Sequence, residues 1–228
     1  MMTKNLIGLD TETCNSLIDE CGKLDLTQSL VYDIGWQVTN KKGKVKKQRS
    51  YVVAEIFLDD TLMSSAYYKD KIPQYWEDIK SGKRQLKRFR NIYFQFLADK
   101  KKYNCNIVFA HNALFDYRAL NNTMRYLTKS KYRFFFPYKM EIWDTLKMAR
   151  DVYGNSRKYF EFCEKNGYMT NHFSPRPRMT AEVLYRYISK DNGFVESHTG
   201  LEDVEIETKI LVKCLRSRKN IRKALFEK

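Results

Sequence analysis

The feature that most constrains the fold is a change of hydrophobic period along the chain. Apolar residues form a short buried run over Asn5–Asp10 and then alternate with polar residues over Val31–Thr39. A turn at Asn40–Gly43 leads into Val45–Ala54, so the three segments are predicted to be strands of an antiparallel meander. Beyond them the apolar spacing becomes helical, which predicts an α/β fold with helices on both faces of one sheet.

After the meander, helices and short strands are predicted to alternate. Helices are expected around Leu86–Leu97, over Asn112–Leu127, from Thr145 onward, over Met179–Ser189 and over Leu201–Arg218. Strands are expected over Asn106–Ala110 and Lys139–Asp144, which completes a mixed five-stranded sheet flanked by helices. We predict a single domain over 1–228, in which the polar segment 155–178, with its glycines and prolines, forms an insertion or lid.

The charge balance favours a polyanionic partner. Lys and Arg number 42 against 27 Asp and Glu, which leaves a net charge of +15. A basic surface binds nucleic acid because each neutralised phosphate releases condensed counterions. The stretch Lys83–Arg90 and the tail from Arg216 to Lys223 are candidate tracks for a nucleic-acid backbone. Both are equally compatible with solvated surfaces.

Membrane insertion and secretion are not indicated. No apolar run approaches the ~20 residues that a membrane span needs. The first residues also lack the apolar stretch of a secretory signal, so the chain is predicted to be cytoplasmic. The five cysteines are scattered without a CxxC pair, which predicts reduced structural thiols rather than a zinc site or a disulfide framework.

An Asp-x-Glu pair stands at the end of the first predicted strand. Asp10 and Glu12 are two residues apart, so a strand directs both carboxylates to one face. Two ionised carboxylates side by side repel each other, and a divalent cation such as Mg²⁺ or Mn²⁺ resolves the repulsion. The pair alone is also compatible with a loop in which one acid caps a turn.

Two further acidic positions accompany predicted helix starts. Asp116 falls in the first turn of a predicted helix, where the positive end of the helix dipole favours an acid. His198 precedes the last predicted helix, and the spacing to Asp203 lets its imidazole overhang that carboxylate. Each feature alone is compatible with an ordinary helix N-terminus. The three features become a strong signal only in combination, in this order and in these structural contexts.

These residues resemble the DEDD exonucleases that carry histidine in the third motif (DEDDh), the family of the proofreading subunit of bacterial replicative polymerase, ribonuclease T and oligoribonuclease. The matching stretches cover most of the chain: Asp10-Thr11-Glu12, Tyr32–Gly35, Asn112–Asp116, Asp144–Leu146 and His198–Asp203. The chain departs from the family's usual core at Leu58–Gly82 and Asn155–Arg178, and Glu202 adds a carboxylate beside the last acid.

The resemblance implies a ribonuclease H-like fold and a 3′→5′ exonuclease with two Mg²⁺ or Mn²⁺ ions per site. It makes Asp10, Glu12 and Asp203 ligands of one ion, with Asp10 bridging to a second that Asp116 supports. It makes His198 the general base, which takes a proton from the attacking water. Nearby acids are expected to raise the pKa of His198, so that activity increases towards mildly alkaline pH.

The backbone near Thr11, together with Asn112 and Phe115, is expected to hold the terminal nucleotide. Bases stack on aromatic faces, although packing in the core is an equally good interpretation of Phe115. Asp144 could be a fifth acid near the metals or could cap the helix that starts at Thr145. For His111 a structural role is favoured.

The expected substrate is the 3′ end of single-stranded DNA, and an exoribonuclease or an oligonucleotidase is the alternative within the same chemistry. An inactive nucleic-acid-binding module is the alternative of another class, but such a module has no chemical need for all five site residues. A transposase or integrase needs no histidine at position 198. The family also suggests association with replication or repair proteins, whereas the sequence leaves the oligomeric state open.

Overall fold

A computed structural model of the chain describes residues 5–15, 17–18, 24–25, 27–217 and 219–226. Its main strands are β1 (Asn5–Cys14), β4 (Leu30–Asn40), β5 (Val45–Val53), β6 (Gln85–Lys87), β7 (Ile107–Ala110) and β8 (Glu141–Asp144). They form one six-stranded sheet in the order β6-β5-β4-β1-β7-β8. β1, β4 and β5 make the predicted antiparallel meander, and β7 and β8 continue it in parallel. The predicted mixed α/β sheet is confirmed.

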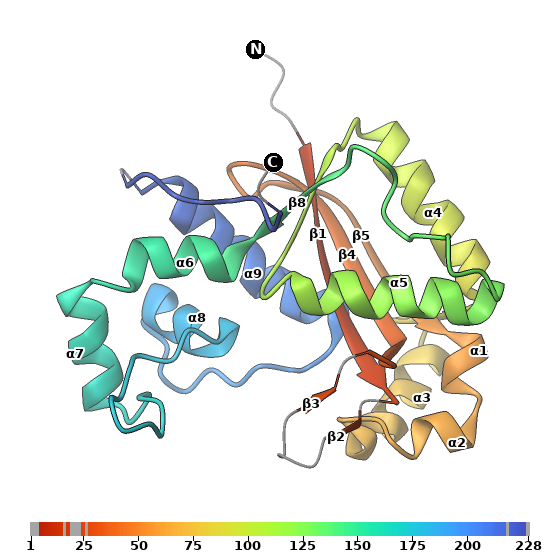
Figure 1. The fold of residues 1–228 in the computed structure, drawn as a ribbon, viewed down its shortest axis with the longest axis horizontal. Coiled ribbons are helices and arrows are strands. Elements are labelled where there is room, and N and C mark those ends of the chain that lie inside the picture. The colour runs from red at the N-terminus through yellow and green to blue at the C-terminus, as the bar shows by residue number, and fades with distance from the viewer. Residues whose placement is uncertain (1–4, 16, 19–23, 26, 218, 227–228) are drawn as a thin grey trace.

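Helices cover both faces of the sheet (Figure 1). One face carries α1 (Ala54–Phe57), α2 (Asp60–Met63), the short 3-10 helix η1 (Lys69–Lys71), α3 (Ile72–Lys80), α4 (Phe89–Lys102) and α5 (Leu114–Thr128). The other carries α6 (Thr145–Tyr153), α7 (Arg157–Lys165), α8 (Ala181–Ser189) and α9 (Gly200–Leu215). A small hairpin of β2 (Leu17–Ile18) and β3 (Leu24–Asp25) lies apart from the main sheet.

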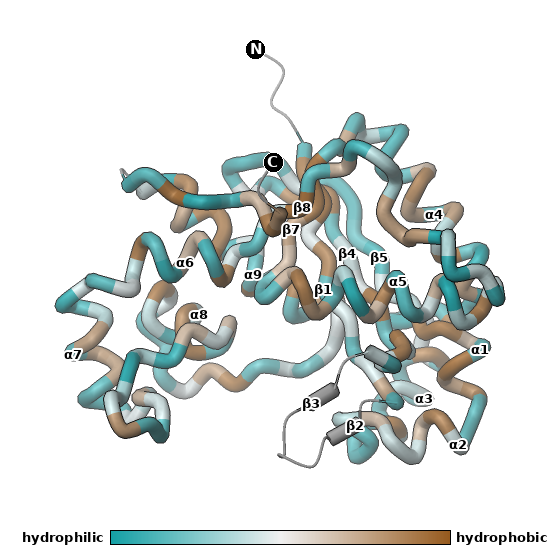
Figure 2. The backbone as a smooth tube through the Cα atoms, viewed as in Figure 1, coloured by the Kyte–Doolittle hydropathy of each residue, from teal (hydrophilic) through white to brown (hydrophobic). Residues whose placement is uncertain are grey.

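The alternation of side chains along β1 divides the core in two. Ile7 and Leu9 belong to the hydrophobic cluster beneath α1–α5, whereas Leu6 belongs to the cluster beneath α6–α9. Figure 2 shows hydrophobic residues concentrated along the central strands, with much of the periphery hydrophilic. Because successive residues of a strand face opposite ways, Asp10 and Glu12 share the α9 face with Leu6.

The structure differs from the sequence prediction in three elements. β1 continues past the Asp-x-Glu pair to Cys14, so the two acids lie within the strand rather than at its end. Gln85–Lys87 pairs in parallel with β5 as a sixth strand, and the predicted helix begins only at Phe89. Short helices α1–α3 fill the stretch after β5, where no element was predicted.

The predicted insertion at 155–178 is partly built into the core. Its first half forms α7, whose Tyr159 and Cys163 are fully buried in the cluster beneath α6–α9. Cys14, Cys105, Cys163 and Cys214 are buried free thiols, as expected for structural cysteines, and Cys21 lies outside the described residues. Among the described helices, none has the length and apolar character required to cross a bilayer.

Candidate active site

α9 approaches the sheet through two glycines. A Cβ on Gly35 of β4 would lie 2.1 Å from the backbone nitrogen of Leu201, and one on Gly200 would lie 2.6 Å from the nitrogen of Gly35. The two backbones can touch only because neither residue has a side chain. Asp33, buried in the same strand, accepts a hydrogen bond from the Gly200 N–H at 2.9 Å. The start of α9 is thereby held against β1 and β4.

This docking brings Asp203 to the acids of β1. Asp203 lies in the first turn of α9 and is only 5% exposed. Its carboxylate accepts hydrogen bonds from the Thr199 N–H at 2.9 Å and the Ser197 hydroxyl at 3.1 Å. Ligand atoms of Glu12, His198 and Asp203 lie within 4.8 Å of one another. The structure therefore brings together residues that the sequence separates by almost 200 positions.

Asp116 reaches the same place from α5. It is 2% exposed and accepts a hydrogen bond from the Thr11 hydroxyl at 2.8 Å. Asn112, in the turn that leads to α5, has a left-handed backbone with φ of 62°, and His198 has φ of 50°. Such a conformation costs a non-glycine residue roughly 1–2 kcal/mol. Strain of this kind concentrates at functional sites, and here it lies in the two turns that present the acids.

The four acids repel one another. Burial, followed by repulsion from Asp116, Glu207, Glu12 and Asp203, raises the pKa of Asp10 well above its usual value. Burial raises the pKa of Asp116 and that of Asp203 to about 7, and it also raises the pKa of Glu12. Carboxylate oxygens are the donors that Mg²⁺ and Mn²⁺ prefer. These residues fit a divalent cation, because its charge would relieve the repulsion.

His198 is held by Tyr68, which precedes η1. The Tyr68 hydroxyl lies 3.0 Å from Nδ1 of His198, and the two rings stack with centroids 4.4 Å apart. Glu196 Oε2 lies 4.0 Å from the same nitrogen. The pKa of His198 is lowered by burial and by Lys71, so the expectation that nearby acids raise it is wrong. The imidazole is thus neutral at physiological pH.

If His198 is the general base that the family resemblance implies, replacing Tyr68 with phenylalanine is expected to lower kcat about fivefold and to leave KM nearly unchanged. The stacked ring remains, but His198 loses a hydrogen bond worth about 1 kcal/mol to its orientation. Steady-state kinetics on a labelled oligonucleotide would measure the split. Tyr185→Phe is the matched control, because it removes a hydroxyl bonded to Lys209 at 3.0 Å. A kcat equal to that of the wild type would show that Tyr68 does not position His198.

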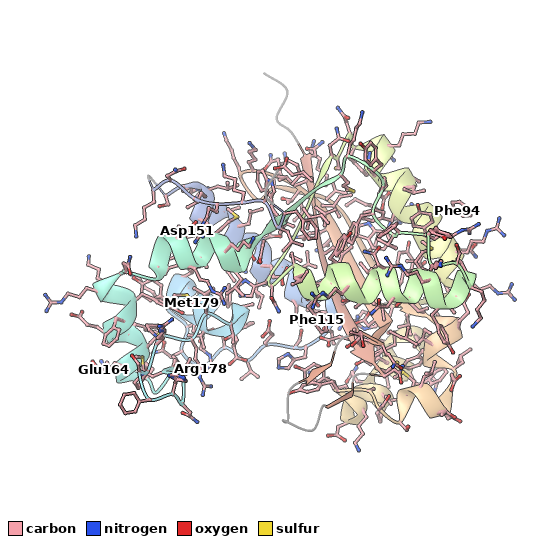
Figure 3. The ribbon with its side chains drawn as sticks, viewed as in Figure 1. Phe94, Phe115, Asp151, Glu164, Arg178 and Met179 are labelled. Atoms are coloured by element: carbon pink, nitrogen blue, oxygen red, sulfur yellow. The ribbon has the colours of Figure 1, made fainter. Side chains whose placement is uncertain are left out.

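A cavity of about 630 Å³ opens over the acids. Thr11, Asn112 and Phe115 line it, as do Arg150 and Arg178. Figure 3 shows Phe115 at the start of α5, with Arg178 and Met179 in the segment that leads to α8. Phe115 is only partly buried, so its ring is available to a ligand. Cationic and aromatic side chains therefore surround an acidic floor.

No protein-family profile and no curated protein matches this sequence. Its fold, however, is shared with solved nucleases. The nuclease domain of 3′hExo, a DEDDh family member bound to rAMP, is 13% identical with a TM-score of 0.57, and the match covers 97% of this chain and 96% of that one. The cell-death related nuclease 4 is 12% identical with a TM-score of 0.58, over 97% and 67% of the two chains. E. coli Exonuclease I in complex with a dA13 oligonucleotide is 10% identical with a TM-score of 0.53, over 92% and 40%.

The chain has the DEDDh exonuclease fold. At these identities the likeness establishes the architecture, and the site must be argued from its own residues. Of the five residues that the motifs singled out, Asp10, Glu12, His198 and Asp203 line this cavity. Asp116 lies behind it and accepts a hydrogen bond from the Thr11 hydroxyl, which is part of the lining. Val204, which follows the last acid, packs over Gly8 of β1, where a Cβ would lie 2.8 Å from its Cγ1.

Other candidates from the sequence have structural tasks in this DEDDh fold. Asp144 caps α6 by accepting the Leu146 N–H at 2.9 Å, so the capping interpretation is confirmed. His111 contacts the Thr145 hydroxyl through Nδ1 and donates from Nε2 to the Met179 carbonyl at 2.7 Å. It thereby joins the end of β7 to the segment before α8, which is a structural role.

Glu202 and the basic stretch Lys83–Arg90 pair with each other. Arg84 is 2% exposed, and its guanidinium contacts Glu202 at 2.9 Å, Asp78 at 2.8 Å and Asp33 at 3.3 Å. Burial opposes ionisation of Glu202, but Lys83 and Arg84 outweigh it and lower its pKa to about 2. Glu202 therefore faces this network instead of the metal site. Arg84 is therefore not available to bind a phosphate backbone. In the C-terminal tail, Arg222 forms an ion pair with Asp151 at 2.7 Å. Arg218 lies outside the described residues.

Three residues of the site were missed in the sequence. Tyr68 lies 130 positions from His198, in a stretch without a predicted element. Glu196 gave no sign beyond its proximity to His198 in sequence. Glu207 offered a usable signal, since it stands one helical turn after Asp203 and therefore on the same face of α9.

Proposed function

We propose that this protein is a metal-dependent 3′→5′ exonuclease that removes nucleotides from the end of single-stranded DNA. The observation that carries the proposal is the convergence of Asp10, Glu12 and Asp203 beside His198 in one cavity, with Asp116 bonded to Thr11 of the cavity lining. A set of buried acids with raised pKa values costs stability, and a protein keeps such a set where it holds a cation.

Asp10, Glu12, Asp116 and Asp203 would hold two Mg²⁺ or Mn²⁺ ions, which stabilise the charge that develops on the scissile phosphate and on the leaving oxygen. His198 takes a proton from the attacking water on Nε2. That nitrogen has a free lone pair when Nδ1–H donates to the oxygen of Tyr68, at 3.0 Å. Water adds to phosphorus and the bond to the 3′-oxygen breaks, which releases a nucleoside 5′-monophosphate and a strand shortened by one residue.

The terminal nucleotide would be held by the backbone near Thr11, by Asn112 and by the ring of Phe115, all of which line the cavity. Stacking on an aromatic ring gives ~1–3 kcal/mol per base without a requirement for sequence. Arg150 and Arg178 are exposed and line the same cavity, where they can meet phosphates beyond the scissile one. Within segment 155–178, Thr170 and Arg178 supply one wall, so we propose that its second half covers the bound strand end.

The deciding experiment compares 5′-labelled single-stranded DNA and RNA of matched sequence, each with Mg²⁺, Mn²⁺ or EDTA. The expected result is a ladder that shortens from the 3′ end only with metal, and faster on DNA. Asp10→Ala should leave both polymers intact. Faster loss of RNA would move the proposal to an exoribonuclease. Binding without cleavage of either polymer would favour the nucleic-acid-binding module. If cleavage is observed, protein partners are to be sought among replication and repair proteins.

The affinity for metal is expected to rise steeply with pH. Asp116 and Asp203 both have pKa values of about 7 because they are buried, so protons compete with the cation. Between pH 6 and 8 each carboxyl changes from mostly protonated to mostly ionised. If both carboxyls release a proton when Mn²⁺ binds, the apparent affinity for Mn²⁺ should rise about 100-fold over this range. Titration of Mn²⁺ without nucleic acid measures this effect.

The stability of the metal-free protein should change in the opposite direction. A carboxyl whose pKa is higher in the folded than in the unfolded state stabilises the fold when protonated, and that stability is lost as pH rises through 7. Thermal unfolding in EDTA should therefore show a lower Tm at pH 8 than at pH 6. A Tm in EDTA that does not fall between pH 6 and 8, or an affinity for Mn²⁺ that does not rise over this range, would contradict the assignment of Asp116 and Asp203 as metal ligands.

A further inference from the structure

Glu207 is a buried acid that the four-acid motif does not account for. It lies on α9, one turn beyond Asp203, on the face that packs against β1. Its side chain lines the cavity, yet the residue is only 2% exposed. Oε1 accepts a hydrogen bond from the His111 N–H at 3.0 Å, whereas the buried Oε2 has no hydrogen-bond partner among the described residues.

The surroundings of Glu207 are acidic. Burial and then repulsion from Asp116 raise the pKa of Glu207, and Glu207 in turn raises the pKa of Asp10 by more than Glu12 or Asp203 does. A buried carboxylate oxygen without a partner destabilises the fold unless a cation or a hydrogen-bond donor meets it. The contact with His111 needs one acceptor oxygen, which a glutamine would supply equally well. The contact with His111 therefore does not explain the second oxygen or the charge.

We propose that Glu207 is a fifth carboxylate of the proposed metal centre, in which its unpartnered Oε2 would be an additional anionic ligand beside Asp10 and Asp116. The inference rests on the proposed function, because it needs a cation at this site. Glu207 lines the same cavity as Asp10 and Asp203, and repulsion from Asp116 and Asp203 acts on its carboxylate, so it lies among the acids of the site. Glu12 and Asp203 lie close together beside His198 in the same cavity.

The test is Glu207→Gln, which keeps the volume and the acceptor for His111 but removes the charge and one anionic oxygen. Mn²⁺ binding is measured without nucleic acid, by the electron paramagnetic resonance signal of free Mn²⁺ and by calorimetry. Glu205→Gln is the matched control: Glu205 is exposed on the same helix and bonds Gln48 at 2.7 Å, outside the cavity. We expect Glu207→Gln to weaken the binding of one ion at least tenfold, and Glu205→Gln to change binding less than twofold.

Thermal unfolding supplies a second readout that does not depend on activity. In EDTA, Glu207→Gln should unfold at a higher temperature than the wild type because repulsion is removed, and its gain in Tm on adding Mn²⁺ should be smaller. A variant that folds and binds Mn²⁺ with the stoichiometry and affinity of the wild type would overturn the proposal. If the wild type itself binds no Mn²⁺, the proposed function fails with it, whereas loss of binding in Asp203→Asn but not in Glu207→Gln rejects the fifth carboxylate alone.

Discussion

Replacing Asp10 with asparagine is expected to abolish cleavage while making the metal-free protein more stable. Asp10 is the acid that the other four repel, and asparagine removes the charge with little change of shape. In the proposed mechanism Asp10 is one of the acids that would hold the cations, so its loss should remove several kcal/mol of transition-state stabilisation, which corresponds to a rate at least about 10³-fold lower. In EDTA the Tm should rise by roughly 2–4 °C for each kcal/mol of repulsion that is relieved.

The opposite signs make this prediction diagnostic. If Asp10 served only to hold the fold together, the same substitution would make the protein less stable, because the hydrogen bonds of the carboxylate would be weakened. Cleavage of labelled single-stranded DNA and thermal unfolding with and without Mn²⁺ measure the two effects, with Glu205→Gln as the control for charge. A variant that unfolds earlier in EDTA, or that retains a tenth of the activity, would show that Asp10 is not at the centre of a metal site.

Replacing Gly35 with alanine is expected to destabilise the protein and to remove its response to metal. The added methyl group would lie 2.1 Å from the Leu201 nitrogen and 2.3 Å from the Gly200 carbonyl carbon, and backbone atoms cannot turn away as a side chain can. Overpacking costs ~1–3 kcal/mol even where side chains give way. We therefore expect a loss of about 3 kcal/mol, or a Tm lower by roughly 6–12 °C.

The loss of metal response follows from the position of Gly35. It pairs with Asp10 across β1 and β4, so an outward shift of α9 carries Asp203 away from that acid. The gain in Tm on adding Mn²⁺ should therefore shrink in Gly35→Ala even at temperatures where the variant is folded. Gly193→Ala is the control, because a methyl group there would meet only the Asp191 carboxylate, at 3.5 Å. Equal effects of the two substitutions would refute close packing of α9 on the sheet.

The sequence predicted what depends on local pattern. Asp10 and Glu12 could be assigned to one face because strand alternation is a property of neighbouring residues. The meander, the helix that follows Asn112 and the helix that carries Asp203 were likewise visible as hydrophobic periods, and their boundaries shifted by only a few residues. The joint occurrence of the motifs, each weak alone, indicated where the chain would return to the same site.

Other features could not be predicted because they depend on distant pairing. Arg84 resembled a member of a basic helix, but its partners Asp33 and Glu202 lie 51 and 118 positions away, and only the fold brings all three together. β6 is a strand because β5 offers it an open edge, although the spacing of Leu86 and Phe89 is helical. Tyr68 falls in a stretch without periodicity, and its place over His198 is set by α2 and η1.

The dependence of the site on α9 also determines when the centre can exist during synthesis. β1, α5 and α9 supply the acids in chain order, and the segment from His198 to Glu207 is the last of these contributions to leave the ribosome. A nascent chain whose first 190 residues have folded still lacks the histidine, the fourth acid and the proposed fifth carboxylate. The proposed nuclease is therefore harmless to nearby nucleic acid until translation has passed α9.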